Sequence, residues 1–449
     1  MSLLSRHESK QETRPLPLEL AARALLRLLA SATPPQAGSF LRFEHEVEHL
    51  DVFRVLAGLA AGQRRYFRTR TGTLEFAGIG VANASLPEGL SQIGGSSEAV
   101  VFTVDAFDPS RVRDRVWETF TQQSAVLPAI ELRRAEHGDR VRSVLAVNVS
   151  DLDVARGWLE VLAQECKPRC SVDPSFTRVP DDISEAAWTR AVRAGLDAIR
   201  NGKLRKVVLG RTARYVASSE IDPMLVLHRL AQTEPRSFRY FIEPQAGRAF
   251  VGVSPERLFS RVGRTLKSEA VAGTRPRGVD AVADQLMGDA LLSSAKDRRE
   301  HQFVVERIRE ALEPFSQTLR FDDEPRLLRL GYVQHLRTRM AVELQEGVTD
   351  EMLLKALHPT PAVSGSPVTE AVHAIRTLEP FDRGLFAGPI GVRTAHASEF
   401  AVGIRSALID GDSLTAFAGA GIVEGSDAAD EWRETAHKLL AFERLSRQS

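Results

Sequence analysis

Apolar residues recur along this chain of 449 residues at two different periods. Where they return every three or four positions, the pattern predicts amphipathic helices. Such helices are expected at residues 17–30, 151–165, 188–201, 294–312 and 427–445. In the fourth of them, Val304, Ile308 and Leu312 follow one face at intervals of four. The last one is preceded by Ser426 and Asp427, either of which would serve as its N-cap.

Shorter runs rich in β-branched residues lie between these helices and predict strands. The expected strands are residues 100–104, 143–149, 206–217, 238–241 and 248–253, with two more around Leu258 and Leu266. Residues 399–423 predict two strands joined by Asp410-Gly411-Asp412, which is a strong hairpin signal. Strands in hairpins mixed with long helices indicate an α+β fold with a mainly antiparallel sheet.

Composition and charge narrow the class of protein. Hydrophobic residues make up 43% of the chain, a share typical of a globular protein and not of a disordered one. Lys and Arg together number 59, as do Asp and Glu, so the formal net charge is zero. Nucleic-acid binding depends largely on positive charge and is therefore disfavoured. The arginines within residues 260–267 and 274–278 keep it as a minor alternative.

The chain carries no recognisable targeting or membrane signal. Residues 1–14 contain charges without the apolar core of a signal peptide, and the apolar stretch 18–30 is interrupted by charged residues. We therefore expect no membrane span and a cytoplasmic protein. Cys166 and Cys170 lack the CxxC spacing and a second pair, so we interpret them as reduced thiols and not as metal ligands.

Four titratable residues stand beside turn signals where the apolar pattern breaks. They are Lys206, Glu256, Glu300 and Glu434. Each has an ordinary structural explanation, because a lysine at the start of a strand is usually solvated and a glutamate one turn from a lysine usually forms an i,i+4 pair. Lys296 with Glu300, and Glu434 with Lys438, have that spacing. Spacing alone therefore leaves both the structural and the catalytic interpretation open.

Glycine-rich segments provide a second signal. Residues 417–432, FAGAGIVEGSDAADEW, lead from a strand into a helix N-terminus, where free N–H groups favour an anion. The G-x-G-x-x-x-G spacing and the hairpin strand do not fit a dinucleotide loop, so a carboxylate is favoured over a pyrophosphate. Residues 270–278, AVAGTRPRG, predict a tight turn, and residues 357–367, LHPTPAVSGSP, predict a loop stiffened by proline. A purely structural role stays open for both.

Nine segments taken in order resemble the chorismate-utilising enzymes. They are KVVLGR, FVGVSPERL, AVAGTRPRG, SAKDRREH, VQHLRT, LHPTPAVSG, RTLEPFDRGLFAGPIG, FAVGIRSA and AGAGIVEGSDAADEWRETAHK, and they span about residues 186–440. The family comprises isochorismate synthases, salicylate synthases, anthranilate synthase large chains and aminodeoxychorismate synthases. The resemblance implies one large α+β unit in which two mainly antiparallel sheets pack together, with helices on the outside and the site between the sheets.

The resemblance also implies how the chain is organised. Residues 186–449 would form the chorismate-binding catalytic region. Residues 1–185, whose motifs are weak, would form the N-terminal part of the same α+β unit. No repeat or low-complexity linker separates the two regions.

Carried over to this chain, the resemblance assigns binding roles to particular residues. Glu300 and Glu434 would hold Mg2+, which would bridge to the ring carboxylate of the substrate chorismate. Arg405 and the backbone of residues 419–422 would grip the other carboxylate. The substrate-binding residues implied are Gly273, Thr274, His335, Arg405, Gly419, Ala420, Gly421, Ile422 and Lys438.

The same resemblance makes Lys206 the general base that activates water and Glu256 the general acid that protonates the departing hydroxyl. Elementary chemistry agrees, since adding water at one ring carbon while hydroxide leaves another needs one base and one acid. Lys206 has to be uncharged to act as a base, which burial beside an arginine would favour. Glu256 has to stay protonated, which an apolar setting among Phe250, Val253 and Leu258 would favour.

Within the family, Lys206 favours a member that activates water, because ammonia-using members generally have glutamine there. One type of aminodeoxychorismate synthase carries a nucleophilic lysine where this chain has Ala272, so that branch is disfavoured. The resemblance thus implies an isochorismate synthase without a glutaminase partner, a monomer or homodimer, in a menaquinone or siderophore pathway. A salicylate synthase, which goes on to eliminate pyruvate, stays an alternative. Less favoured are an anthranilate or aminodeoxychorismate synthase component and a non-catalytic chorismate-binding subunit.

Three positions qualify the resemblance. The usual tyrosine of RG-x-Y-x-G is Phe386 here, which removes a hydroxyl that could contact the substrate, and the usual tryptophan after GPIG is Val392. Glu379, in the segment LEPFDRG, matches a further acidic position whose role stays open. None of these positions belongs to the base, the acid or the metal carboxylates, so activity is still predicted.

Overall fold

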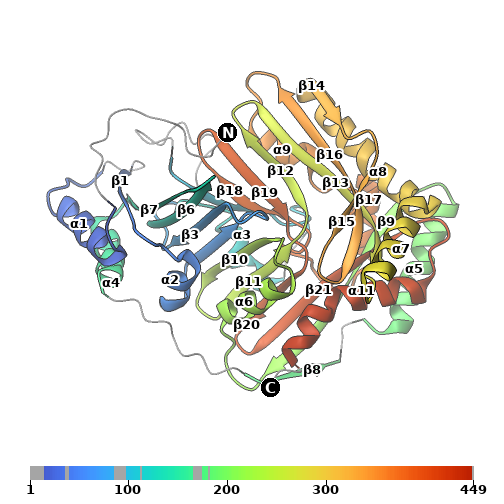
Figure 1. The fold of residues 1–449 in the computed structure, drawn as a ribbon. Helices are drawn as coiled ribbons and strands as arrows, with labels where there is room; N and C mark the ends of the chain where they lie inside the picture. The colour runs from blue at the N-terminus through green and yellow to red at the C-terminus, as the bar shows by residue number, and fades with distance from the viewer. Residues whose placement is uncertain are drawn as a thin grey trace.

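The structure is a computed structural model that describes residues 15–35, 40–84, 98–111, 114–164, 174–180 and 183–446. Cys166 and Cys170, with the expectation about their redox state, lie outside these residues. Two large β-sheets form the body of the molecule, and helices lie on their outer sides (Figure 1). The predicted α+β class with two antiparallel sheets is confirmed.

The first sheet draws its strands from the whole length of the chain. Within the described ranges it has 12 strands. Their order in space is β1 (Leu41–Glu46), β7 (Arg140–Val149), β6 (Ile130–His137), β3 (Leu74–Ile79), β2 (Arg64–Arg68), β10 (Phe238–Gln245), β11 (Arg248–Ser254), β20 (Ser406–Asp410), β21 (Ser413–Ile422), β9 (Lys206–Ala217) and β17 (Gly365–Ser366), and β8 (Phe176–Val179) also pairs with β9. Neighbouring strands pair antiparallel throughout, as hairpin connections allow.

The second sheet has nine strands among the described residues and is also antiparallel. In spatial order it consists of β14 (Ser316–Phe321), β16 (Val333–Leu344), β13 (Thr265–Pro276), β12 (Arg257–Val262), β19 (Ala397–Val402), β18 (Pro389–Arg393), β4 (Val101–Val104) and β5 (Ala125–Val126), and β15 (Arg326–Arg329) pairs with β16. The N-terminal part of the chain therefore enters both sheets, because β2 pairs with β10 in the first and β4 pairs with β18 in the second.

Eleven α-helices within the described ranges pack around and against the two sheets. They are α1 (Leu18–Ala30), α2 (Val52–Gly58), α3 (Arg115–Thr121), α4 (Leu152–Leu162), α5 (Glu185–Arg200), α6 (Pro223–Thr233), α7 (Ala281–Ser293), α8 (Ala295–Leu312), α9 (Asp350–Leu357), α10 (Val368–Leu378) and α11 (Ala428–Glu443). All five helices predicted from the pattern occur, as α1, α4, α5, α8 and α11. No helix within the described ranges is both long enough and apolar enough to cross a membrane.

Two helices that border the pocket described in the next section, α8 and α11, begin at side-chain caps. The Ser294 hydroxyl accepts a hydrogen bond from the Asp297 N–H and starts α8, and the Asp427 carboxylate accepts from the N–H groups of Ala429 and Asp430 and starts α11. Such caps satisfy N–H groups that the helix itself leaves unpaired. Helix α8 packs against β13 and α11 against β21, so both helices are held at fixed places on a sheet.

The predicted hairpin at residues 399–423 is wrong in one respect, because it contains three strands and not two. Its first part belongs to β19 of the second sheet, and the chain crosses to β20 of the first sheet at Gly403, Ile404 and Arg405. The turn at Asp410 to Asp412 is where it was expected. Arg405 has a φ of 52°, which residues with a Cβ adopt reluctantly. A run of apolar residues with one glycine gave no sign of this crossing.

The tight turn predicted at residues 270–278 is also wrong. Most of this segment continues β13, whose pairing with β16 runs on through Pro276. Gly273 has a φ of 74° and sits where the register shifts between Ala272 and Thr274, so the glycine makes a β-bulge and not a turn. Bulges often re-aim neighbouring side chains.

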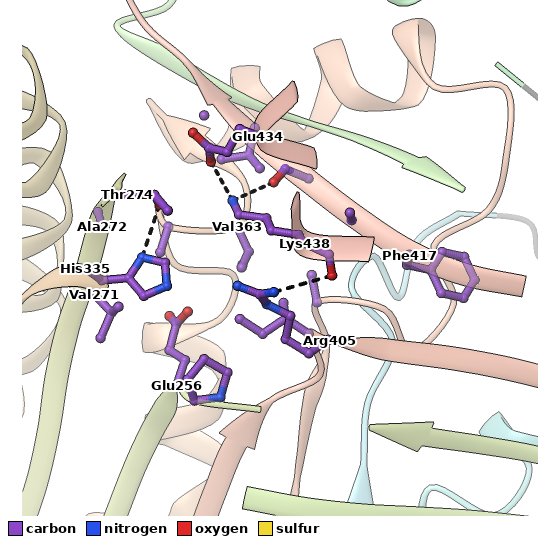
Figure 2. Close-up of a pocket in the computed structure, with 18 of the residues that line it drawn as sticks. Glu256, Val271, Ala272, Thr274, His335, Val363, Arg405, Phe417, Glu434 and Lys438 are labelled. Carbon is purple, nitrogen blue, oxygen red and sulfur yellow. Dashed lines mark hydrogen bonds and ion pairs between the residues drawn. The ribbon is translucent and has the colours of Figure 1, made fainter. Parts of the chain in front are cut away.

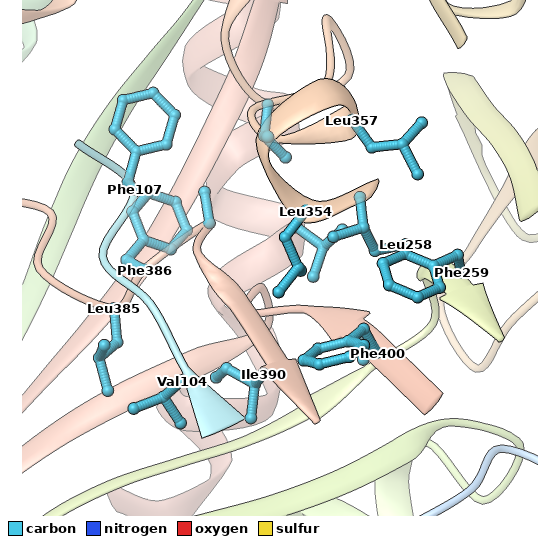
Figure 3. Packing of buried hydrophobic residues seen from close by; sticks show 14 of the residues in the cluster. Val104, Phe107, Leu258, Phe259, Leu354, Leu357, Leu385, Phe386, Ile390 and Phe400 are labelled. Carbon is cyan, nitrogen blue, oxygen red and sulfur yellow. The ribbon is translucent and has the colours of Figure 1, made fainter. Parts of the chain in front are cut away.

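Large apolar side chains from both sheets and from several helices form one buried cluster, and Figure 3 shows part of it. Phe259 and Phe400, on neighbouring strands of the second sheet, have ring centroids 5.0 Å apart. Leu354 and Leu357 of α9 belong to the same cluster. Each such side chain contributes about 1.5–3 kcal/mol when fully buried. A second cluster lies under the outer helices, and together they give the site rigid walls.

Candidate active site

One pocket brings together most of the residues singled out in the sequence. Those that line it are Glu256, Gly273, Thr274, Glu300, His335, Arg405, Gly419, Gly421, Glu434 and Lys438. They come from strands of both sheets, from α8 and α11, and from the crossing between β19 and β20. Figure 2 shows Glu256, His335 and Arg405 on one side and Glu434 with Lys438 on the other.

Lys206 lies at the first position of β9, just behind the pocket lining. Its side chain is 1% exposed, and Nζ donates a hydrogen bond of 2.9 Å to Oε1 of Glu300. The partner is therefore a carboxylate and not the arginine that we expected beside it. A Cβ on Gly421 would lie 2.5 Å from Glu300 Oε1 and 3.0 Å from Lys206 Cε, so a glycine is needed there to leave room for the pair.

Glu256 lies in the short connection between β11 and β12, with its backbone fixed on both sides. Its N–H donates to the Ser254 hydroxyl, and its carbonyl accepts from Val402 N–H at 3.1 Å. Burial and then the nearby charge of Glu269 raise the pKa of Glu256 to about 8, against the opposing effect of Lys206 and Lys438. The carboxyl group is accordingly protonated near neutral pH.

His335, on β16, stands opposite Thr274 in the register with β13. Its Nδ1 lies 3.1 Å from Thr274 Oγ1 and 3.3 Å from the Gly273 carbonyl. Burial and then the charges of Arg405 and Lys438 lower the pKa of His335 to about 3, so the imidazole is neutral. Since a carbonyl can only accept, the proton is placed on Nδ1, which leaves Nε2 as an acceptor.

Arg405 presents a buried guanidinium to the pocket. Nη1 donates to the Lys438 carbonyl at a long 3.4 Å, and among the described residues no carboxylate forms an ion pair with it. Burial lowers the pKa of Arg405, and the more distant charges of Glu234 and Glu434 oppose this effect. A buried cation without a partner is costly, so this position favours the binding of an anion.

Glu434 and Lys438 form the i,i+4 pair that the helical spacing suggested. Lys438 Nζ donates to Glu434 Oε1 at 2.6 Å and to the Gly419 carbonyl at 2.9 Å. The other suggested pair does not form, because Lys296 binds Glu431 at 3.1 Å instead of Glu300. The pair at Glu434 is nevertheless part of the pocket and not of a solvated helix face.

The two candidate metal carboxylates suit a divalent cation. Glu300 and Glu434 come from different helices and line the same pocket. Burial opposes ionisation of Glu300, but the positive charges of Lys206, Lys438 and Lys296 outweigh it and lower its pKa. Mg2+ commonly binds one or two ionised carboxylates together with waters, so this donor set fits.

The glycine-rich strand contributes fewer residues to the pocket than expected. Gly419 and Gly421 line it, whereas Ala420 and Ile422 are buried in the hydrophobic core, and Ile422 lies toward Gly195 of α5. The alternation of a strand explains the difference, because successive residues face opposite sides. Beyond Ala416 this strand pairs with β9 alone, so the backbone groups on its other edge are left for the pocket.

A buried ion pair that sequence reasoning left without a role supports one wall. Arg383 donates to Glu379 at 2.5 and 2.9 Å, and also to the carbonyls of Val208 and Val363. Glu379 accepts from the Gly210 N–H at 2.6 Å. The pair thus ties β9 to the proline-stiffened loop, and Glu379 has a structural role, while Arg383 also reaches the lining. Sequence analysis did not single out Arg383, although its place in the segment LEPFDRG could have indicated a role.

An aromatic pair forms the apolar end of the pocket. The rings of Phe386 and Phe417 stack with centroids 5.1 Å apart, and both line the pocket. Phe386 is the position where a tyrosine was expected, so the missing hydroxyl does concern the pocket. Val392, in contrast, is buried in β18 outside the lining. Phe417 was missed in the sequence because an aromatic residue in a strand is usually core.

Comparisons with known proteins agree with these observations. A family model described as "Chorismate binding enzyme" matches residues 88–445. The chain is 38% identical over 350 residues to a salicylate biosynthesis isochorismate synthase of Pseudomonas aeruginosa, covering 75% of this chain and 72% of that protein. It is 31% identical over 439 residues to isochorismate synthase MenF of Escherichia coli, covering 95% and 98%. The solved structure of the menaquinone-specific enzyme MenF from Escherichia coli matches with a TM-score of 0.84 and 28% identity, covering 96% of this chain and 99% of that one.

Proposed function

Because the chain belongs to the family of chorismate binding enzymes, we propose that it is an isochorismate synthase, an isomerase that converts chorismate to isochorismate. Water would add at C2 of the ring while the C4 hydroxyl departs. The relatives from Pseudomonas aeruginosa and Escherichia coli that are named as isochorismate synthases support this proposal. The same relatives favour the isochorismate synthase branch of the family over the branches that use ammonia.

The observation that carries the proposal is an acid and a candidate base at one pocket. Glu256 holds its proton near neutral pH, since its pKa is raised to about 8 by burial. Lys206 is buried behind the opposite lining and close enough for its charge to act on Glu256. Two titratable groups in such different environments are typical of an acid and base pair.

These two groups account for the bonds made and broken, and the turnover closes when Lys206 releases its extra proton to solvent and Glu256 takes one back from it. The oxygen of a water molecule bonds to C2, and its proton passes to Nζ of Lys206, which must be uncharged at that moment. The ring double bonds shift, and the C4–O bond breaks as the departing oxygen takes the proton of Glu256. One water is taken up and one is released, so the product is an isomer of the substrate.

Substrate binding would use the unpaired positive charge of the pocket. Chorismate carries two carboxylates, and Arg405 is a buried cation without an ion-pair partner among the described residues. Lys438 and the backbone N–H groups on the edge of β21 that no second strand covers within the described ranges add further donors. The stacked rings of Phe386 and Phe417 supply an apolar surface. Charge-assisted hydrogen bonds of this kind are the strong ones.

We assign the metal position to Glu300 and Glu434. Mg2+, when bound there, would supply positive charge next to the ring carboxylate of the substrate. Lys206 donates to Oε1 of Glu300, so this one carboxylate would serve both the base and the metal. Gly421 keeps the space in which it can do so.

The test is to incubate the purified protein with chorismate and Mg2+ and to separate the products by chromatography. Isochorismate as the only product is expected. Salicylate with pyruvate would replace the proposal by a salicylate synthase, and anthranilate formed only with ammonium would contradict the role of Lys206. Binding of chorismate without any product would indicate a non-catalytic subunit. A preparation of Glu256→Gln, treated identically, controls for contaminating host enzymes.

A further inference from the structure

The crossing that carries Arg405 into the pocket is held at several backbone points. Gly403 N–H donates to the Gly388 carbonyl at 2.7 Å, and Val253 N–H donates to the Arg405 carbonyl at 3.1 Å. Between them, the carbonyl of Ile404 accepts a hydrogen bond of 2.8 Å from the hydroxyl of Tyr240. That bond comes from a side chain and not from the backbone, so one residue controls it.

Tyr240 reaches this carbonyl by lying across the strand between them. In the first sheet Tyr240 of β10 pairs with Gly252 of β11, and Gly252 pairs with Ser406 of β20, so the three residues form one row. A Cβ on Gly252 would lie 2.2 Å from Oη and 2.4 Å from Cζ of Tyr240. The glycine therefore provides the space through which the tyrosine ring passes to the third strand.

The backbone at the crossing needs such support. Arg405 has a φ of 52°, a conformation that a residue with a Cβ holds only when its surroundings impose it. Tyr240 is fully buried, and burial raises the pKa of its hydroxyl well above the usual range, so it remains a donor at every pH of interest. Its bond to Ile404 lies one residue before the strained position.

We propose that Tyr240 is a positioning residue for Arg405, and that Gly252 is the complementary gap that lets it act. Tyr240 does not line the pocket and touches no reacting atom. Its hydroxyl fixes the Ile404 peptide, and this fixes the direction in which the Arg405 guanidinium points. The proposal rests on the proposed function, in which Arg405 holds one carboxylate of chorismate.

Tyr240→Phe tests this role, because it keeps the ring across Gly252 and removes only the hydroxyl, with its hydrogen bonds to the Ile404 carbonyl and the Ser406 side chain. We expect KM for chorismate to rise about tenfold, which corresponds to about 1.4 kcal/mol of binding free energy. We expect kcat to change less than about twofold, because Arg405 holds a carboxylate that does not react and so contributes similarly to ground and transition states. An unchanged KM, or a fall in kcat alone, overturns the proposal.

Tyr66→Phe is the matched control. Tyr66 is a buried tyrosine of β2 whose hydroxyl donates to Glu75, and it lies outside the pocket lining. Both variants should lose thermal stability, but only Tyr240→Phe should raise KM. Equal rises in KM in the two variants would mean general loosening of the sheet and would contradict a specific role for Tyr240.

Gly252→Ala keeps the test decisive if Tyr240→Phe folds poorly, and a double variant sharpens it. Gly252→Ala should also raise KM, because the added methyl displaces the tyrosine ring. In an Arg405→Ala background, Tyr240→Phe should change kcat/KM by less than about twofold, since nothing is left to position. Independent effects in the double variant overturn the proposal. If the unchanged protein itself neither binds nor converts chorismate, the proposed function has failed, which is a separate result.

Discussion

The two walls of the pocket handle charge in opposite ways. On the wall formed by β9, β21, α8 and α11, Lys206 is paired with Glu300 and Lys438 with Glu434. On the wall formed by the β11–β12 connection, β13 and β16, burial leaves Glu256 protonated and His335 neutral. One wall keeps ionised groups by pairing them, and the other removes charge by excluding water. Such a contrast provides a proton donor and a polar, ionised surface within one pocket.

The largest expected effect comes from removing the reacting group of either wall. Lys206→Ala and Glu256→Gln should each lower kcat by about a hundredfold to ten-thousandfold, the usual contribution of a general base or acid. Chorismate binding, measured by titration calorimetry with Mg2+ present, should persist in both. Substantial turnover in either variant would remove that residue from the mechanism. Lys203→Ala, an exposed lysine just before the same strand, is the control and should behave as the unchanged protein.

The paired wall is expected to lose its metal when its carboxylates are neutralised. Glu300→Gln or Glu434→Gln should weaken Mg2+ binding at least about tenfold, since even residues that only support metal ligands are worth that much. Mg2+ titration without substrate measures this directly. Glu306→Gln is the matched control, because Glu306 is an exposed glutamate on the same helix as Glu300 and does not line the pocket. A metal affinity equal to that of the unchanged protein would refute the assignment.

How well the sequence predicted each wall depends on how local its geometry is. Lys206, Glu300 and Glu434 stand at element ends or on helix faces that the apolar pattern located well. The position of Arg405 depends on a crossing between sheets, and the bulge at Gly273 depends on pairing between distant strands. Neither leaves a local pattern, because both are decided by contacts far apart in sequence.

The family motifs supplied part of the information that the local apolar pattern lacks. They assigned Arg405 to the pocket, which it lines, although the strand boundaries around it were predicted incorrectly. They could not separate lining from core within residues 419–422, where Ala420 and Ile422 are buried and do not line the pocket. They also left Glu379 without a role, because its partner Arg383 and the Gly210 N–H become neighbours only in the folded chain. The direction of a side chain and the identity of its partner are decided by the tertiary structure.

The buried wall should set the alkaline limit of activity. The general acid must be protonated, and the pKa of Glu256 is raised to about 8, so kcat/KM should fall about tenfold per unit as the pH rises above this value. Raising the pH through the pKa of Glu256 removes the proton that the acid must donate, so activity falls. His335, with a pKa lowered to about 3, adds no transition near neutrality. The measurement is a pH profile at saturating Mg2+.

The control for the profile is Glu256→Gln, whose residual activity should lack the alkaline fall. A profile of the unchanged protein that stays level to about one unit beyond pH 8 would contradict a protonated Glu256 as the acid. The pH dependence of the free energy of unfolding should also reflect Glu256. Because its pKa is raised, the carboxyl group stabilises the folded state at low pH, and this contribution is lost as the pH rises through about 8. Glu256→Gln should therefore flatten the pH dependence of the free energy of unfolding.

The smallest effect is expected at the aromatic end, which belongs to neither charged system. Phe386→Tyr introduces the hydroxyl that the resemblance predicts at this position, while the ring can keep its stacking on Phe417. If that hydroxyl reaches a substrate oxygen, a net gain of about 0.5–1.5 kcal/mol would lower KM about twofold to tenfold with kcat unchanged. Steady-state kinetics of the two proteins side by side measure it. A raised KM would mean that the hydroxyl is buried without a partner, and that this chain adapted its pocket to phenylalanine.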